Sequence, residues 1–310
     1  MIVAATALWV AVAAAIAFIY YVRLVEPRRL QLTEVEVPIE HLPEALDGLT
    51  IAQISDLHYR PAADRERLCR QAVDLANAAR TDLIVLTGDL ADGYDVLEPC
   101  LEHLKALSAP LGVWAVLGNH DHYCLRGGIF RVTRPPSERE RREALAAAGI
   151  KLLINEATRL EIGGGSLALV GVDDASSGRD DLPAALASAE RADLVVLLSH
   201  SPDILDDPAA DAADLVLCGH THGGQITLPG VGSPWAPVWR DRRRCSGLMR
   251  AGRALCYVSR GVSSASQARF RCRPEVAVLT LQKGAPEGVR SVRVRRMSNE
   301  QPAVVEEVSS

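Results

Sequence analysis

The chain has 310 residues, of which 48% are apolar, so it has enough nonpolar material to bury a large α/β core. Its formal net charge of −5 gives no general attraction to a polyanion, and we therefore expect no nucleic-acid partner. The seven cysteines lie without CxxC spacing, which argues against a disulfide framework and a thiolate zinc site, and a reducing compartment is the simplest interpretation.

The N-terminal segment from Met1 to Val22 contains no charged or amide side chain. A helix of that length would measure about 33 Å, enough to cross the hydrocarbon core of a membrane. Tyr20 and Tyr21 close the run and Arg23 follows, as in an aromatic belt with a basic cytoplasmic flank. We expect an uncleaved single-pass anchor at residues 1–22, with the remaining chain in the cytoplasm. The alternatives are a cleaved signal peptide, although no basic n-region or small-x-small site is present, and an extracytoplasmic domain.

Residues 23–48 predict a linker that contains one extended stretch as the first strand. Buried apolar strands and amphipathic helices then alternate, which is typical of sheets covered by helices. Early strands are expected at 49–55, 82–87 and 112–117, and the helices that follow them at 64–80, 95–107 and 137–148. Later strands are expected at 151–155, 158–162, 166–172, 193–200, 214–220, 254–261 and 275–281, with a helix at 181–191. The sequence therefore predicts a domain over 49–283, followed by a flexible tail at 284–310.

Five of these apolar runs end in residues that bind metal ions. They are Asp56 and His58 (SDLH), Asp89 (GDL), Asn119 and His120 (GNHD), His200 (LSHSP), and His220 and His222 (GHTHGGQ). Each alone has an ordinary explanation as a helix cap or a turn residue. Because active groups in such sheets gather at the carboxyl ends of strands, all five together predict one shared metal centre.

The chemistry of the donors indicates which ions fit. Seven of these residues are counted as oxygen or imidazole donors, and such a set without thiolate suits manganese, iron or zinc: Asp56, His58, Asp89, Asn119, His200, His220 and His222. Seven donors are too many for one tetrahedral ion but suit two ions that share a carboxylate. Two such ions about 3.5–4 Å apart can clamp a phosphoryl group and hold a hydroxide between them at neutral pH.

The order DLH, GDLAD, GNHD, a single His and GHTH resembles the full signature of the calcineurin-like metallophosphoesterases. The GGQ after GHTH, the EPRRL segment after the apolar run, and YVSRG, RF and RPEVAVLTL near the end are similar to a membrane-associated bacterial branch. The resemblance covers about residues 25–282. It implies a four-layer α/β/β/α sandwich of two mixed sheets, preceded by one transmembrane helix.

The resemblance also implies a role for each motif residue. One metal ion would be held by Asp56, His58 and His222, the other by Asn119, His200 and His220, with Asp89 as the bridge between them. His120 would be the acid or the phosphate-orienting group, and Asp92 its carboxylate partner. Mn²⁺ is the expected ion, with Fe or Zn as alternatives. Arg260 and Arg269 are candidate contacts to the substrate phosphate.

We therefore expect a hydrolase that cuts a phosphomonoester, phosphodiester or pyrophosphate bond by attack of a metal-bridging hydroxide. The anchor favours a membrane-borne substrate, because tethering raises the local concentration. The bacterial branch is similar to enzymes that cleave UDP-2,3-diacylglucosamine in lipid A synthesis, which would suit the cytoplasmic face. The alternatives are a phosphodiesterase or phosphatase of the cell envelope, and a non-catalytic scaffold such as the retromer subunit that resembles this family.

Two loops mix arginine with apolar side chains. One covers residues 123–136, and the other includes Trp235, Trp239 and the arginines that follow. Each could touch the bilayer or be an ordinary solvated loop, and the sequence leaves both alternatives open.

Overall fold

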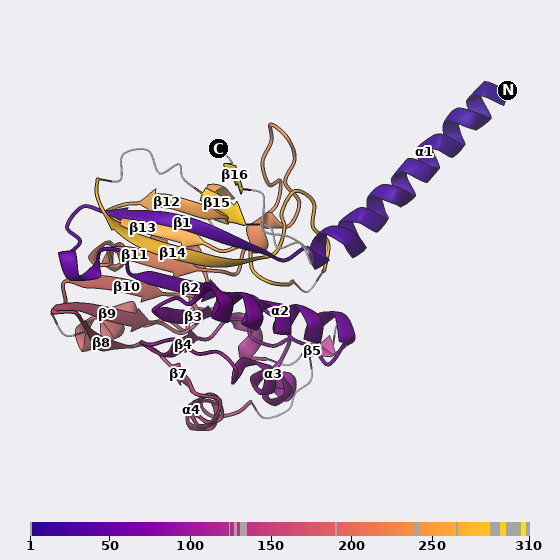
Figure 1. The fold of residues 1–310 in the computed structure, drawn as a ribbon. Coiled ribbons are helices and arrows are strands. Elements are labelled where there is room, and N and C mark those ends of the chain that lie inside the picture. Colours follow the sequence, from indigo (N-terminus) through magenta and orange to yellow (C-terminus); the bar gives the residue numbers. More distant parts are fainter. Residues whose placement is uncertain are drawn as a thin grey trace.

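Two mixed β-sheets pack face to face, helices cover their outer faces, and one long helix projects from the body (Figure 1). This computed structural model describes residues 2–123, 125–126, 129–130, 135–189, 191–238, 242–264, 266–285, 292–295 and 305–307. The layered arrangement confirms the predicted fold class. Most of the predicted tail at 284–310, half of the loop at 123–136, and Trp239 lie outside the described residues.

The projecting helix is α1 (Ile2–Tyr20), which a π turn (Tyr21–Val25) and a 3-10 turn (Glu26–Arg28) continue. The 27 residues from Ile2 to Arg28 are long and apolar enough to cross a membrane, and the most apolar part is not buried by any other segment. No residue of α1 packs into the core. The predicted apolar span is therefore a helix whose side chains are free to face lipid.

The first sheet has the strand order β16-β15-β1-β14-β2-β3-β4-β7. The bounds are β1 (Gln31–Ile39), β2 (Thr50–Ile54), β3 (Leu83–Thr87), β4 (Val113–Val116), β7 (Ile150–Leu152), β14 (Glu275–Lys283), β15 (Val292–Arg295) and β16 (Val305–Glu307). β2, β3, β4 and β7 run parallel, and β14 is antiparallel to β2. The extended stretch expected inside the linker is β1, which pairs with β14 along its whole length.

The second sheet has the strand order β12-β13-β11-β10-β9-β8. The bounds are β8 (Glu156–Ile162), β9 (Gly165–Gly171), β10 (Leu194–Leu198), β11 (Leu215–Cys218), β12 (Gly247–Ala251) and β13 (Ala254–Val258). The four inner strands are parallel, and both edge strands are antiparallel to their neighbours. β12 was not predicted, because its residues are only partly buried and lack a clear alternation. A short hairpin joins β5 (Leu125–Arg126) to β6 (Ile129–Phe130).

Helices pack on the outer face of each sheet. α2 (Ala63–Ala79), α3 (Leu97–Leu104) and α4 (Glu138–Ala147) share one apolar core with the first sheet, and Ser137 caps α4 as predicted. α5 (Leu182–Ser188) covers the second sheet. Further 3-10 turns lie at Glu44–Leu46, Tyr94–Val96, Asn119–Asp121, Ala175–Ser177, Pro202–Asp206, Pro208–Ala212, His222–Gly224 and Arg242–Cys245. The core between the sheets is mostly aliphatic and includes Trp114 and Tyr257, and the candidate site residues lie beyond the ends of the strands.

Candidate metal centre

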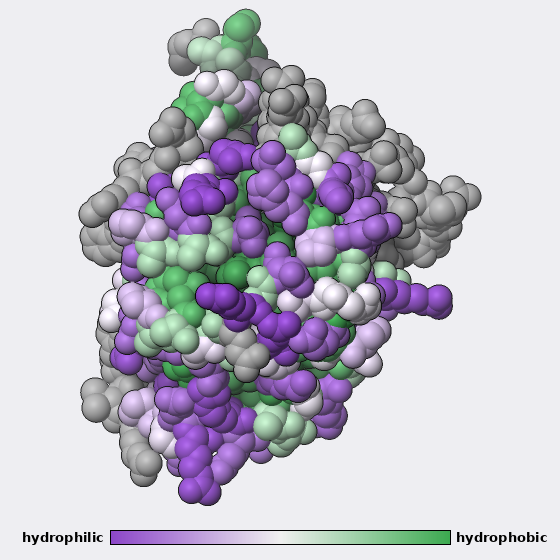
Figure 2. Space-filling view, turned by 90° about the vertical axis from the view of Figure 1, so that its left-hand side faces the viewer, coloured by the Kyte–Doolittle hydropathy of each residue, from purple (hydrophilic) through white to green (hydrophobic). Residues whose placement is uncertain are grey.

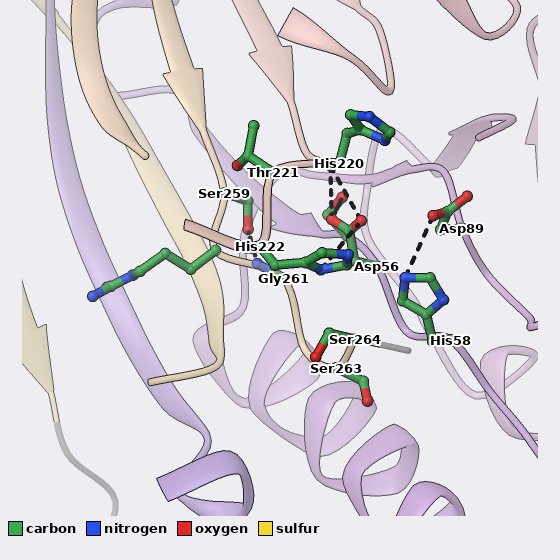
Figure 3. Close-up of polar contacts among 12 residues, drawn as sticks. Asp56, His58, Asp89, His220, Thr221, His222, Ser259, Gly261, Ser263 and Ser264 are labelled. Atoms are coloured by element: carbon green, nitrogen blue, oxygen red, sulfur yellow. Dashed lines mark hydrogen bonds and ion pairs between the residues drawn. The ribbon is translucent and has the colours of Figure 1, made fainter. Parts of the chain in front are cut away.

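Loops at the carboxyl ends of five parallel strands bring all the predicted ligands together. β2 leads to Asp56 and His58, β3 to Asp89, β4 to Asn119 and His120, β10 to His200, and β11 to His220 and His222. None of these residues is exposed. In Figure 3 the labelled members from β2, β3 and β11 converge on one region. The structure therefore brings the five strand ends together in one region.

The donor atoms form neighbouring groups. Asp56, His58 and His222 offer atoms within 4.8 Å of one another, and so do Asp89, His200 and His220. In the first group, His222 Nδ1 lies 3.7 Å from Asp56 Oδ1. Each group has the size and composition to hold one metal ion.

Asp89 lies between the two groups. Its Oδ2 is 3.4 Å from His58 Nε2 and 3.3 Å from His200 Nε2. Asn119 Oδ1 lies 3.2 Å from His200 Nε2, on the second group's side. A third possible group joins His58 and Asp89 to His120, so proximity alone also allows His120 to be a ligand.

Two buried nitrogen atoms at the centre are suited to coordinate a cation. His58 Nε2 and His222 Nδ1 have no hydrogen-bond partner among the described residues. A buried polar atom without a partner is costly, and a metal ion would satisfy both nitrogens. His200 Nδ1 donates to the Thr87 carbonyl at 2.8 Å, which directs Nε2 toward Asp89 and Asn119. The residues present therefore fit a pair of divalent ions.

The electrostatics of the centre favour bound cations. Burial lowers the pKa of His220 to about 4 and the pKa of His222 well below its usual range, so both rings are neutral at pH 7. Burial would raise the pKa of Asp89, but the facing His200 and His58 hold it well below its usual range. Burial alone would lower the pKa of His200, but Asp89 outweighs it and raises that pKa to about 10. The centre thus combines a buried negative charge with imidazole lone pairs.

Asp92 contacts more groups than the sequence indicated. Its Oδ1 accepts from His58 Nδ1 at 2.6 Å and lies 3.4 Å from His120 Nδ1, while Arg60 Nε donates to Oδ2. The closer contact orients His58 so that Nε2 faces the centre. The predicted pairing with His120 is present at ion-pair distance, but Asp92 also positions His58.

Three further residues near the centre were missed by sequence reasoning. His122 Nε2 lies 2.6 Å from Asp173 Oδ1, and Arg141 Nη1 lies 3.1 Å from His122 Nδ1. Tyr123 OH accepts from Asn119 Nδ2 at 2.8 Å. The only local signal was the continuation of GNHD into a second histidine and a tyrosine, whose partners are distant in sequence.

Strained backbone marks the same loops. Left-handed φ angles occur at five of the candidate ligands: Asp56 (52°), His58 (42°), Asp89 (52°), His220 (68°) and His222 (50°). Residues other than glycine adopt this region at an energetic cost, and such residues cluster at functional sites. The fold therefore pays a conformational cost to aim these side chains at one another.

We expect Gly118→Ala to disrupt the centre because the backbone at Gly118 lies against Asp89. An added Cβ would lie 2.6 Å from the Asp89 backbone nitrogen and closer still to Oδ1, where no side chain can move away easily. The expected result is loss of bound metal and of phosphoesterase activity. Metal analysis of the purified variant checks this, with Gly284→Ala as the matched control, since a Cβ there meets nothing within 4 Å.

The two arginines predicted to contact phosphate have other partners. Arg260 Nε donates to Glu275 Oε2 at 2.9 Å, and the Arg269 side chain donates to the carbonyls of Gly261, Ser263 and Cys272. Arg269 is also only 1% exposed. Contact between these arginines and a substrate stays a prediction.

Comparisons with known proteins agree with this geometry. Residues 49–224 match the family model described as calcineurin-like phosphoesterase. The chain is 30% identical to the metallophosphoesterase YkuE of Bacillus subtilis (84% of this chain, 89% of that protein) and 35% identical to the phosphodiesterase YaeI of Escherichia coli (74% and 80%). It is 27% identical to the UDP-2,3-diacylglucosamine pyrophosphatase LpxG of Chlamydia muridarum (82% and 90%).

Proposed function

Because this chain belongs to the calcineurin-like phosphoesterase family, and is a metal-dependent hydrolase of phosphoester bonds, we propose that it cuts a phosphoester or pyrophosphate bond of a lipid-linked substrate at a membrane surface. The observation that carries the proposal is the set of donor groups around Asp89, in which His58 Nε2 and His222 Nδ1 are buried and have no hydrogen-bond partner among the described residues.

We assign one ion to Asp56, His58 and His222, and the other to Asn119, His200 and His220, with Asp89 shared. When bound, two divalent ions, of which we propose Mn²⁺, supply Lewis-acid polarisation and a nucleophile at neutral pH. His120 is proposed to hold a proton on Nδ1 or Nε2 and to donate it to the phosphoryl or leaving oxygen. Asp92 orients both His120 and His58.

The anchor and two relatives support the choice of substrate. The name of LpxG assigns to that protein a pyrophosphate bond of an acylated sugar nucleotide, and the name of YaeI assigns to it a phosphodiester. The helix long enough to span a membrane supports this choice, because anchorage would keep the centre close to lipid headgroups. We propose UDP-2,3-diacylglucosamine as the substrate, with the domain on the cytoplasmic face and the protein as a single-pass membrane enzyme.

Metal removal gives the first test of this function. We expect the full chain in detergent, loaded with Mn²⁺, to hydrolyse bis-p-nitrophenyl phosphate, p-nitrophenyl phosphate or UDP-2,3-diacylglucosamine. Chelation should abolish hydrolysis and re-addition of Mn²⁺ should restore it, because the proposed nucleophile needs the ions. Metal-loaded protein that hydrolyses none of the three substrates would support the scaffold alternative instead.

Topology decides between the cytoplasmic and the envelope alternatives. Two reporters would be fused to the C-terminus, one that is active only in the cytoplasm and one that is active only after export. We expect activity of the cytoplasmic reporter. Activity of an exported reporter would favour a cell-envelope phosphodiesterase or phosphatase.

A further inference from the structure

One loop carries most of the large apolar side chains exposed on the domain. Apart from Leu24 beside α1, the exposed large apolar residues of the described domain all fall within residues 226–235. They are Ile226 (36% exposed), Leu228 (38%), Val231 (71%) and Trp235 (56%). Scattered single apolar residues are normal on a surface, but such a concentration within ten residues of sequence indicates a contact surface.

The backbone of this apolar loop is closed on itself. Leu228 and Gly232 exchange hydrogen bonds of 2.8 and 2.9 Å, so the turn through Pro229 and Gly230 needs no outside partner there. Ser233 Oγ donates to the Trp235 carbonyl at 2.9 Å, which holds the base of the loop. A segment whose polar backbone groups are paired internally can approach an apolar phase at lower cost.

The apolar loop is joined to the foot of α1. Thr227 N donates to the Phe270 carbonyl, and Phe270 N donates to the Gln225 carbonyl, both at 2.9 Å. The Phe270 ring meets the Phe18 ring of α1 edge-on, with centroids 5.1 Å apart. In the same strip, Arg269 N donates to the Val22 carbonyl at 3.0 Å. The loop therefore lies beside the end of the apolar helix (Figure 1).

The surface beside the C-terminal end of α1 differs in polarity from the surface on the opposite side of the domain. Figure 2 shows the side turned away from α1, where hydrophilic side chains predominate. Near the foot, by contrast, the apolar loop is accompanied by exposed cations at Arg23, Arg28, Arg29 and Arg271. Apolar side chains next to arginines suit the interface of a bilayer that contains anionic lipids.

We propose that the apolar loop at 226–235 inserts into the surface of the same bilayer that α1 enters, as a second membrane contact. The loop begins directly after the turn that carries His222 and Gly224, so this contact would hold the metal centre at the level of lipid headgroups. The inference rests on the proposed membrane anchorage and deepens the proposed function. It identifies the substrate class as a phosphate-bearing lipid that is presented within the membrane plane.

The test places an environment-sensitive fluorophore at single introduced cysteines of the full chain in vesicles of phosphatidylcholine and phosphatidylglycerol. The positions are Val231→Cys on the apolar loop, Val10→Cys within α1, and Glu102→Cys on the exposed face of α3 as a matched control. The labelled parent chain is the blank for the native cysteines. Metal content and thermal unfolding of each variant verify the fold.

We expect brominated lipids to quench the labels at Val231 and Val10 and to leave the label at Glu102 unchanged. Quenching at Val10 without quenching at Val231 would overturn the loop contact while keeping the anchor. Absence of quenching at Val10 would instead remove the proposed anchorage on which the inference rests. Concentration-dependent energy transfer between Val231 labels, without lipid quenching, would assign the loop to a contact between two copies of the chain and overturn the proposal.

Discussion

Replacing Asp89 by Asn is expected to lower turnover by more than about a hundredfold. Loss of a residue that only orients a metal ligand costs up to about a hundredfold, and Asp89 is proposed to bind the ions directly. Asp89 Oδ2 lies 3.4 Å from His58 Nε2 and 3.3 Å from His200 Nε2, so one carboxylate reaches a histidine of each donor group. Its amide analogue keeps the shape but removes the negative charge that both ions would share. Metal analysis of Asp89→Asn should therefore show fewer than two ions per chain.

The matched control for this variant is Asp74→Asn, which removes one carboxylate from the exposed face of α2. It should bind metal and turn over bis-p-nitrophenyl phosphate as the unmodified chain does. If Asp89→Asn also bound two ions and kept normal turnover, the assignment of Asp89 as the shared ligand would be wrong.

The proximity of the candidate ligands could be predicted from sequence, because each motif lies within a few residues of the strand that precedes it. Each motif follows a short buried strand, and parallel strands of one sheet end at the same edge. In the structure β2 and β3 are parallel neighbours, so Asp56 after β2 and Asp89 after β3 lie at the same edge. The same reasoning placed His200 and His220 after β10 and β11.

The contact of Asp92 with His58 could not be predicted in this way, although its pairing with His120 was expected. Whether a carboxylate lies 2.6 Å from one histidine or 3.4 Å from another depends on how loops from β2, β3 and β4 pack together. The left-handed backbone at Asp56 and Asp89 could not be predicted either, because few non-glycine residues adopt it, even though Asp does so more often than most.

Long-range strand pairing was also hidden from the sequence. Residues 31–39 alternate in burial as a strand should, but their partner β14 begins more than two hundred residues later. A single sequence gives the period of a strand and not its neighbour. The extended stretch in the predicted linker therefore indicated a strand but not that β14 would be its partner.

The double role of Asp92 determines which variant tests the acid. Removing Asp92 would free both His58, a proposed ligand, and His120, the proposed acid, so a loss of activity would have two explanations. His120 can be changed while the closer contact between Asp92 and His58 stays intact. The cleaner experiment is therefore the substitution of His120 itself.

We expect His120→Asn to keep both ions and to lose about 10²–10⁴-fold in turnover, the usual contribution of a positioned general acid. Burial alone would lower the pKa of His120, but Asp92 and Asp89 outweigh it and raise that pKa, which favours a protonated ring able to donate. The exposed His41, changed to Asn, is the matched control and should have no effect on metal content or rate.

The dependence on leaving group separates the possible roles of His120. A proton donor matters most when the leaving oxygen is strongly basic, so His120→Asn should slow hydrolysis of an alkyl phosphodiester more than that of bis-p-nitrophenyl phosphate. An equal loss for both substrates would indicate that His120 stabilises charge on the phosphoryl group instead. Loss of one ion would place His120 among the ligands, as its proximity to His58 and Asp89 permits, and would contradict the acid role.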